Sequence, residues 1–167
     1  MRFSFNFILH LLGFGVLVTT LLAGFILDRK FRSEQNVDLK LYVGGIVRTI
    51  GLLSPLAAFI LFTTGIGNIY NRYADSTTSW YQEGWLVAKI MVFVLMLLNG
   101  VIYGPKLSRS RMNLVKTMRD NTAPADPEKL LALINRQLTL FYLVQTVLLL
   151  LIIYLSVFGS AKHPGAF

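Results

Sequence analysis

The order of hydrophobic and polar residues along the chain predicts four membrane-crossing helices. Four long apolar runs lie at about residues 5–27, 42–66, 85–104 and 138–158, and polar segments separate them. Each run is close to the ~20 residues that an α-helix needs to cross ~30 Å of hydrocarbon. The predicted fold is therefore all-α, with residues 1–167 forming a single integral membrane domain, a four-helix transmembrane bundle.

The composition agrees with this pattern and excludes several kinds of chemistry. Of the 167 residues, 54% are hydrophobic and 14% are charged, which is too apolar for a soluble domain of this length. There is no cysteine, so disulfides, thiolate metal sites and cysteine nucleophiles are excluded. The first run meets Asp28 without a small-x-small cleavage site, and we expect a retained helix rather than a signal peptide.

The charged residues predict how the bundle is oriented. The formal net charge is +8, and its distribution favours a topology signal over nucleic-acid binding. The connections near 28–41 and 105–137 are rich in basic residues, and the positive-inside rule places both in the cytoplasm and both termini outside. The aromatic 67–84 loop and Trp85 are typical of the outer interface. The inner set is Arg29, Lys30, Arg32, Lys40, Lys106, Arg109, Arg111, Lys116, Arg119, Lys129 and Arg136, against Arg2, Arg72 and Lys162 outside.

Polar residues near 127 predict where the fourth helix begins. Asp126 is a good N-cap, Pro127 suits the first helical position, and Glu128 favours the positive end of the helix dipole. The helix is therefore predicted to begin near 127, with its first turns outside the bilayer. Segment 105–126 is open to two interpretations, a continuation of the third helix or an amphipathic helix along the cytoplasmic face.

Polar residues inside membrane helices are candidates for function by default. No Asp or Glu lies within the four runs, which weighs against a carboxylate proton relay and most ion-coupled transporters. Helical phase predicts one inward face on each of the first and third helices, with Gly100 and Gly104 suited to close helix packing. The first face comprises Asn6, His10, Gly13, Leu17, Thr20 and Gly24, and the second comprises Lys89, Phe93, Met96, Gly100 and Tyr103.

His10 and Lys89 are predicted to lie at the same depth, near the outer end of the bundle. Their helices cross the membrane in the same direction, and each residue is near the start of its run. A neutral histidine can ligate heme iron, and a lysine can pair with a heme propionate. Alternatively, Lys89 snorkels to the outer headgroups and His10 hydrogen-bonds a neighbouring helix. The residues alone favour this alternative, because single polar groups are common near helix ends.

Four segments of the chain carry a resemblance to a known family. FILHLLGF, LLSPLAAFILFTTG, GWLVAKIMVFVLMLLNG and EKLLALINRQLTLFYLVQTVLLLLIIYL resemble the HemJ-type protoporphyrinogen oxidases, whose wider group includes copper-resistance D-like membrane proteins. The resemblance implies that His10 and Lys89 are the functional pair and that Pro55 is the proline of helix 2. It implies heme b with His10 as axial iron ligand. It also implies a bacterial inner-membrane oxidoreductase of porphyrin biosynthesis, which oxidises protoporphyrinogen and passes electrons to a membrane acceptor or redox partner.

Two other functions stay open. A cofactor-free structural or assembly subunit would use the small-residue faces to bind partner helices of a membrane complex or of a second copy of the chain. A copper-handling protein would need soft ligands, because copper(I) prefers thiolates and thioethers. The apolar runs contain no Cys and offer only the imidazole of His10 and the thioethers of Met91 and Met96. These are poor ligands for copper.

Overall fold

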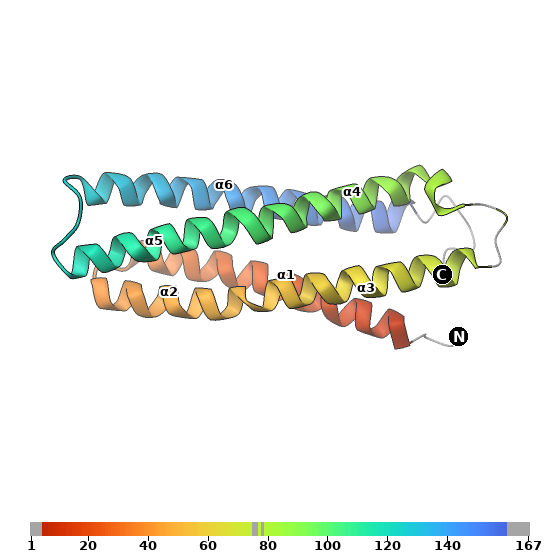
Figure 1. Cartoon of the computed structure of the whole chain (residues 1–167), viewed down its shortest axis with the longest axis horizontal. Coiled ribbons are helices and arrows are strands. Elements are labelled where there is room, and N and C mark those ends of the chain that lie inside the picture. The colour runs from red at the N-terminus through yellow and green to blue at the C-terminus, as the bar shows by residue number, and fades with distance from the viewer. Residues whose placement is uncertain (1–4, 75–76, 78, 160–167) are drawn as a thin grey trace.

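The computed structural model describes residues 5–74, 77 and 79–159. They form a bundle of long antiparallel helical columns (Figure 1). Four columns are long and apolar enough to cross a membrane, and the chain is a multi-pass membrane protein. In chain order the elements are α1 (Phe5–Ser33), α2 (Val37–Gly51), α3 (Leu53–Tyr73), η1 (Trp80–Gln82), α4 (Gly84–Leu98), η2 (Asn99–Tyr103), α5 (Gly104–Arg119), α6 (Pro127–Tyr154) and η3 (Leu155–Gly159).

The two ends of the bundle carry different residues. The α1–α2 and α5–α6 connections lie together at one end, and the first turn of α1, the α3–α4 connection and the last turn of α6 lie at the other (Figure 1). The predicted grouping of loops is thus confirmed, whereas the side of the membrane that each end faces stays a prediction. Arg2 and Lys162 lie outside the described residues. We call the first end the basic end, after Arg29, Lys30, Arg32, Lys116 and Lys129. We call the second end the aromatic end, after Tyr70, Tyr73, Trp80, Tyr81 and Trp85.

The helices extend further at the basic end than the apolar runs predict. The first helix continues to Ser33, the second begins at Val37, and the third column continues through α5 to Arg119. An apolar run marks only the part of a helix that lies in hydrocarbon, and it does not show where the same helix ends in water. Segment 105–126 therefore begins as a continuation of the third helix, which is the first of the two interpretations left open by the sequence. The predicted start of α6 at Pro127 is confirmed, although the Asp126 side chain makes no capping hydrogen bond.

The inward face predicted for the first helix is confirmed. Gly13, Thr20 and Gly24 are buried, and α1 packs along α3. A Cβ atom on Gly13 would lie 3.0 Å from Ile60 Cγ2, and one on Gly24 would lie 3.1 Å from the Tyr142 hydroxyl. Small residues at these positions let the helices approach closely, which is how helices associate where lipid removes the hydrophobic driving force.

Proline interrupts the second and third columns at a similar depth. The second column is broken at Leu52, before Pro55, because proline has no N–H and its ring crowds the carbonyl of Gly51. The third column is interrupted directly before Pro105, where η2 forms a π-helical turn. These breaks lie side by side in the bundle and line a groove described below.

The π-helical turn changes which residues of the third column face inward. It inserts one residue into the helix, which rotates every later position. Tyr103, predicted on the inward stripe, is 59% exposed, and that prediction is wrong for this reason. A Cβ on Gly104 would lie 2.9 Å from Phe141 Cζ, and one on Gly100 would lie 2.9 Å from Gln145 Nε2. The predicted close packing at Gly100 and Gly104 is confirmed, and their partner is α6.

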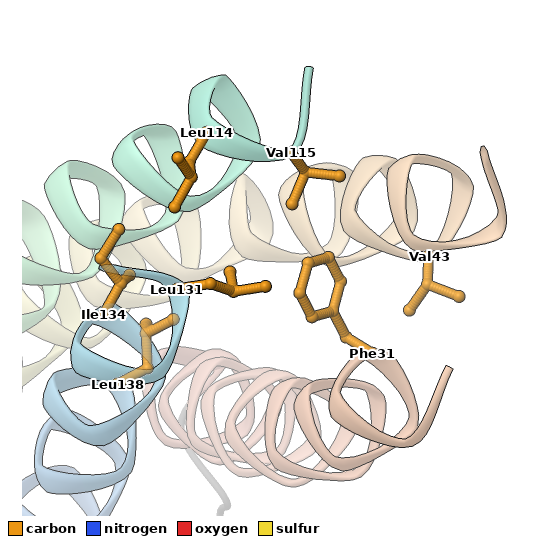
Figure 2. Close-up of a cluster of buried hydrophobic side chains, with 7 residues drawn as sticks. All are labelled: Phe31, Val43, Leu114, Val115, Leu131, Ile134 and Leu138. Carbon is orange, nitrogen blue, oxygen red and sulfur yellow. The ribbon is translucent and has the colours of Figure 1, made fainter. Parts of the chain in front are cut away.

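Two clusters of buried apolar side chains hold the columns together. In the middle of the bundle, Met96, Leu149 and Ile152 join α4 to α6 and pack against α1 residues. The larger cluster, which we call the basic-end core, lies where α1, α2, α5 and α6 meet (Figure 2). Most of this core lies beyond the apolar runs, with only Val43 and Leu138 at the ends of runs, so the hydrophobic effect contributes there much as in a soluble protein. Its residues are Phe31, Val43, Leu114, Val115, Leu131, Ile134 and Leu138.

The turn between α1 and α2 is fixed by local hydrogen bonds. The Asn36 side chain caps α2 by accepting from the N–H groups of Asp38, at 2.8 Å, and Leu39, at 3.2 Å. The Glu34 carboxylate accepts from the N–H groups of Asn36, at 3.1 Å, and Gln35, at 2.9 Å. Because these bonds stabilise the charged form, they hold the pKa of Glu34 below its ordinary value.

Candidate functional site

His10 lies in a polar contact between α1 and α3, towards the aromatic end. Its Nδ1 is 2.8 Å from Thr64 Oγ1. The Thr64 hydroxyl donates its hydrogen to the Ile60 carbonyl, at 2.5 Å. A hydroxyl has only one hydrogen, so Thr64 accepts from His10, and we assign the imidazole proton to Nδ1. Nε2 then carries the lone pair and is the nitrogen that could bind a metal.

Further hydrogen bonds hold this part of α1 against α3. Asn6 Nδ2 donates to the Thr64 carbonyl, at 2.8 Å, and to Asn68 Oδ1, at 2.6 Å. Gly65 leaves room beside the imidazole, since a Cβ there would lie 3.8 Å from His10 Cε1. Histidine ligands of metals usually donate their other N–H to a fixed acceptor, which sets the tautomer and the ring orientation. Thr64 supplies such an acceptor for His10, and it is a residue that the sequence did not single out.

Lys89 is half-buried on α4, at the same end of the bundle. His10 on α1 and Lys89 on α4 thus lie on different helices towards the same end of the bundle. Within the described part of the chain, no residue forms a hydrogen bond or ion pair with Lys89 Nζ. A cation inside a membrane helix is costly without an opposite charge, so an anionic ligand would be favoured beside it.

The possible copper ligands do not converge on one site. Met91 is 63% exposed, and Met96 is buried in the mid-bundle cluster. Among the residues that the structure describes, no group of three or more His, Cys, Asp or Glu side chains could hold a metal ion. His163 lies outside these residues. His10 is therefore the candidate ligand on which a metal site would depend.

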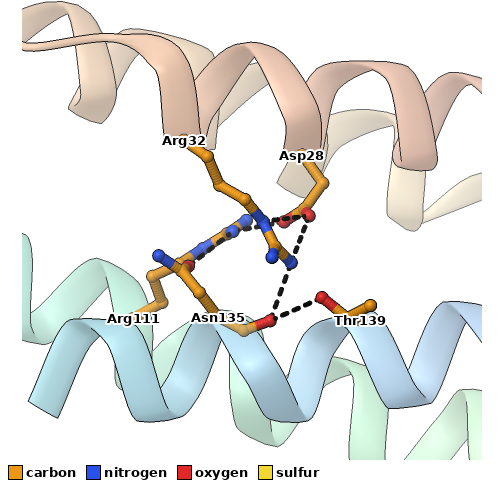
Figure 3. Close-up of polar contacts among 5 residues, drawn as sticks. All are labelled: Asp28, Arg32, Arg111, Asn135 and Thr139. Carbon is orange, nitrogen blue, oxygen red and sulfur yellow. Dashed lines mark hydrogen bonds and ion pairs between the residues drawn. The ribbon is translucent and has the colours of Figure 1, made fainter.

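A buried charged cluster at the basic end was not predicted (Figure 3). Asp28 is 4% exposed and Arg111 is 1% exposed, and they form an ion pair between α1 and α5. Asp28 also accepts from Arg32 Nε at 2.8 Å. Arg32 Nη2 in turn donates to the Asn135 carbonyl at 2.7 Å, and this carbonyl also accepts from Thr139 Oγ1 at 3.1 Å. The cluster thus joins α1, α5 and α6.

The charges in this cluster do not cancel. The single carboxylate of Asp28 forms ion pairs with two guanidinium groups, those of Arg32 and Arg111, which leaves a net positive charge. The Arg111 guanidinium also lies 4.0 Å from the centroid of the Phe31 ring, where the negative face of the ring attracts a cation. Phe31 therefore links the charged cluster to the basic-end core.

Asp28 lies in α1 just beyond the apolar run at 5–27, and that run itself contains no Asp or Glu. Asp28 follows Gly24 at the i+4 position and continues the inward face of α1. Similarly, Arg111 shares the buried stripe of α5 with Leu114 and Val115. Helical phase was therefore a signal that could have found both residues. Both Asp28 oxygens bind guanidinium groups, which suits a structural ion pair rather than a proton carrier.

Two open grooves on the surface of the bundle lie away from His10 and Lys89. One, of about 580 Å³, runs along α6 beside Arg32 and Arg136. The other, of about 490 Å³, adjoins Pro55 and Pro105. Both are closer to the basic end, so they are separate from the candidate site at the aromatic end.

Comparison with known proteins does not assign the chain to a family. No family model matches it, and neither a curated protein nor a solved structure matches it. The resemblance to the HemJ-type oxidases accordingly stays a prediction. What the helices support is a multi-pass membrane protein with a four-helix bundle fold.

Proposed function

We propose that this protein binds heme b within the membrane, with His10 as an axial ligand of the iron. The observation that carries the proposal is the hydrogen bond from His10 Nδ1 to Thr64 Oγ1. It fixes the imidazole on α1 and leaves Nε2, which no described residue hydrogen-bonds, as the coordinating nitrogen. This is the arrangement of ligand and supporting acceptor that metal-bound histidines use.

The residues present fit the chemistry of heme b. A neutral imidazole suits the iron, and the unpaired ammonium of Lys89 suits a propionate carboxylate. The two residues come from α1 and α4, and a heme held by both would join helices that pack mainly on other partners, α3 and α6. When bound, heme would supply one-electron transfer in the membrane. His10 would hold the iron and Lys89 would balance a propionate charge.

The reaction proposed for such a site follows the sequence resemblance. Oxidation of protoporphyrinogen to protoporphyrin removes hydrogen from the macrocycle and requires an electron acceptor, for which a membrane quinone or protein partner is suited. The hydrocarbon around the bundle and the positive charge of Lys89 favour an apolar macrocycle with carboxylate side chains. This substrate class is therefore a second step of the proposal, to be tested after heme binding itself.

Replacing His10 is expected to remove heme from the purified protein. The His10→Ala variant loses the iron ligand, so its Soret absorbance per chain should fall to background. His163→Ala is the matched control, because it removes the other histidine of the chain and should keep the wild-type spectrum. Thr64→Val should keep the ligand but weaken heme affinity by about 10–100-fold, as losses of supporting hydrogen bonds do.

Lys89 variants separate charge from side-chain shape in the same assay. Lys89→Gln should release heme more readily, and Lys89→Arg should retain it because the cation is preserved. A His10→Ala protein with an undiminished Soret band would contradict the proposal. A wild-type protein that is folded, colourless and bound to a larger membrane complex would favour the assembly-subunit alternative.

A further inference from the structure

A groove opens on the side of the bundle where proline interrupts the second and third columns. It has a volume of about 490 Å³. Its apolar half is formed by Pro55 of α3 with Val101 and Ile102 of η2, and its polar half is formed by α5. The two halves are therefore stacked along the axis of the bundle.

The polar half is one face of a single helix. Lys106, Arg109, Ser110 and Asn113 occupy the i, i+3, i+4 and i+7 positions of α5, and all four line the groove. In the described part of the chain, neither Lys106 nor Arg109 forms an ion pair. The cations of the buried cluster, in contrast, share Asp28. The groove thus presents two uncompensated positive charges flanked by a hydroxyl and an amide.

The depth of the groove matches the boundary between hydrocarbon and headgroups. Counting ~20 residues from Gly84, where α4 begins, places the end of the hydrocarbon near Gly104. The same count back from Tyr73, the end of α3, reaches the vicinity of Pro55. The apolar half therefore lies in hydrocarbon, and the charged half lies at the level of the lipid phosphates.

We propose that this groove binds an anionic phospholipid. The phosphate lies between Lys106 and Arg109, with Ser110 and Asn113 as hydrogen-bond partners, and an acyl chain lies against Val101 and Ile102. A phospholipid fits better than a free phosphate ion because half of the groove is apolar. Basic pockets between membrane helices are suited to anionic headgroups. In this groove both cations can bind the headgroup, since neither forms an ion pair within the described part of the chain.

Lipid binding is tested by native mass spectrometry of the whole detergent-purified chain, titrated with phosphatidylglycerol or phosphatidylcholine. Wild type is expected to retain phosphatidylglycerol preferentially. The Lys106→Gln/Arg109→Gln variant should lose this preference, with bound phosphatidylglycerol falling on the order of tenfold. The Lys116→Gln/Lys129→Gln control removes the same charge from the same end, outside the groove, and should bind as wild type does.

A second variant tests the apolar half without changing charge. Ile102→Trp fills part of the groove, and it should reduce phosphatidylglycerol binding while the protein keeps its helical circular-dichroism spectrum. Equal losses in the two charge variants would overturn the proposal, because they would indicate general electrostatic attraction. Displacement of the lipid by millimolar inorganic phosphate, or unchanged binding by Ile102→Trp, would also overturn it, since a free anion needs no acyl contact.

Discussion

The Asp28→Asn protein is expected to be less stable than wild type by about 3–5 kcal/mol, the usual loss when one partner of a buried ion pair is removed. Asp28 is the only carboxylate that the described part of the chain places against Arg111 and Arg32. Without it, the Arg111 guanidinium, which is 1% exposed, keeps its charge in a site that water does not reach. Asparagine retains the size of the side chain, so the loss reports charge rather than packing.

The matched control for this variant is Arg32→Gln. The side chain of Arg32 is 31% exposed, and its removal leaves the pair between Asp28 and Arg111 intact. We therefore expect a loss of about 1 kcal/mol or less, as for exposed ion pairs. Unfolding of both proteins would be followed by circular dichroism in mixtures of dodecyl maltoside and SDS. Similar small losses for the two variants would contradict a structural role for the buried pair.

Phe31→Ala is expected to lower the free energy of unfolding by about 3–5 kcal/mol, as other truncations of fully buried phenylalanines do. Phe31 is 0% exposed and contacts both the basic-end core and the Arg111 guanidinium. Alanine would leave a cavity where α1, α2, α5 and α6 meet, and it would remove the aromatic face from a buried cation. The measurement is the same detergent unfolding transition.

Phe31→Leu divides this loss into its two parts. Leucine fills much of the volume of phenylalanine but has no aromatic face, so its loss should be smaller than that of alanine. The loss in free energy of unfolding that Phe31→Leu still shows should include the cation–π contribution, which is about 2 kcal/mol when the cation is desolvated. Unfolding transitions of Phe31→Ala and wild type that coincide would show that the basic-end core does not stabilise the bundle.

These variants also separate stability from the proposed heme site. Asp28 and Phe31 lie at the basic end of α1, and His10 lies towards the aromatic end of the same helix. We expect the His10→Ala protein to lose heme but to unfold at the same SDS fraction as wild type. Such a protein has lost a ligand rather than its fold.

The membrane-crossing part of the fold could be predicted because the bilayer imposes simple rules on it. The lengths of the apolar runs predict the four membrane-crossing columns. The recurrence of small residues predicts the faces on which the helices pack closely, at Gly13, Gly24, Gly100 and Gly104. The phase of the third column could be followed only as far as η2. Within η2 the π-helical turn rotates the helix, and Tyr103, its last residue, faces outward as a result.

The sites were harder to predict because they depend on contacts distant in sequence. Asp28 and Arg111 are far apart along the chain, and helical phase shows that each faces inward without showing that they meet. For the same reason the sequence could suggest His10 as a ligand but not Thr64 as its hydrogen-bond partner. The roles of His10 and Lys89 in binding heme remain predictions.

The central claim is tested most directly by the visible spectrum of the wild-type protein, purified in detergent after expression with ample heme precursor, oxidised and then reduced. We predict a Soret band that shifts on reduction, with an intensity that corresponds to about one heme per chain, because His10 is the one histidine among the described residues. A featureless spectrum from folded protein would contradict the account. His10 would then serve to pack α1 on α3, and Lys89 would anchor α4 at the interface.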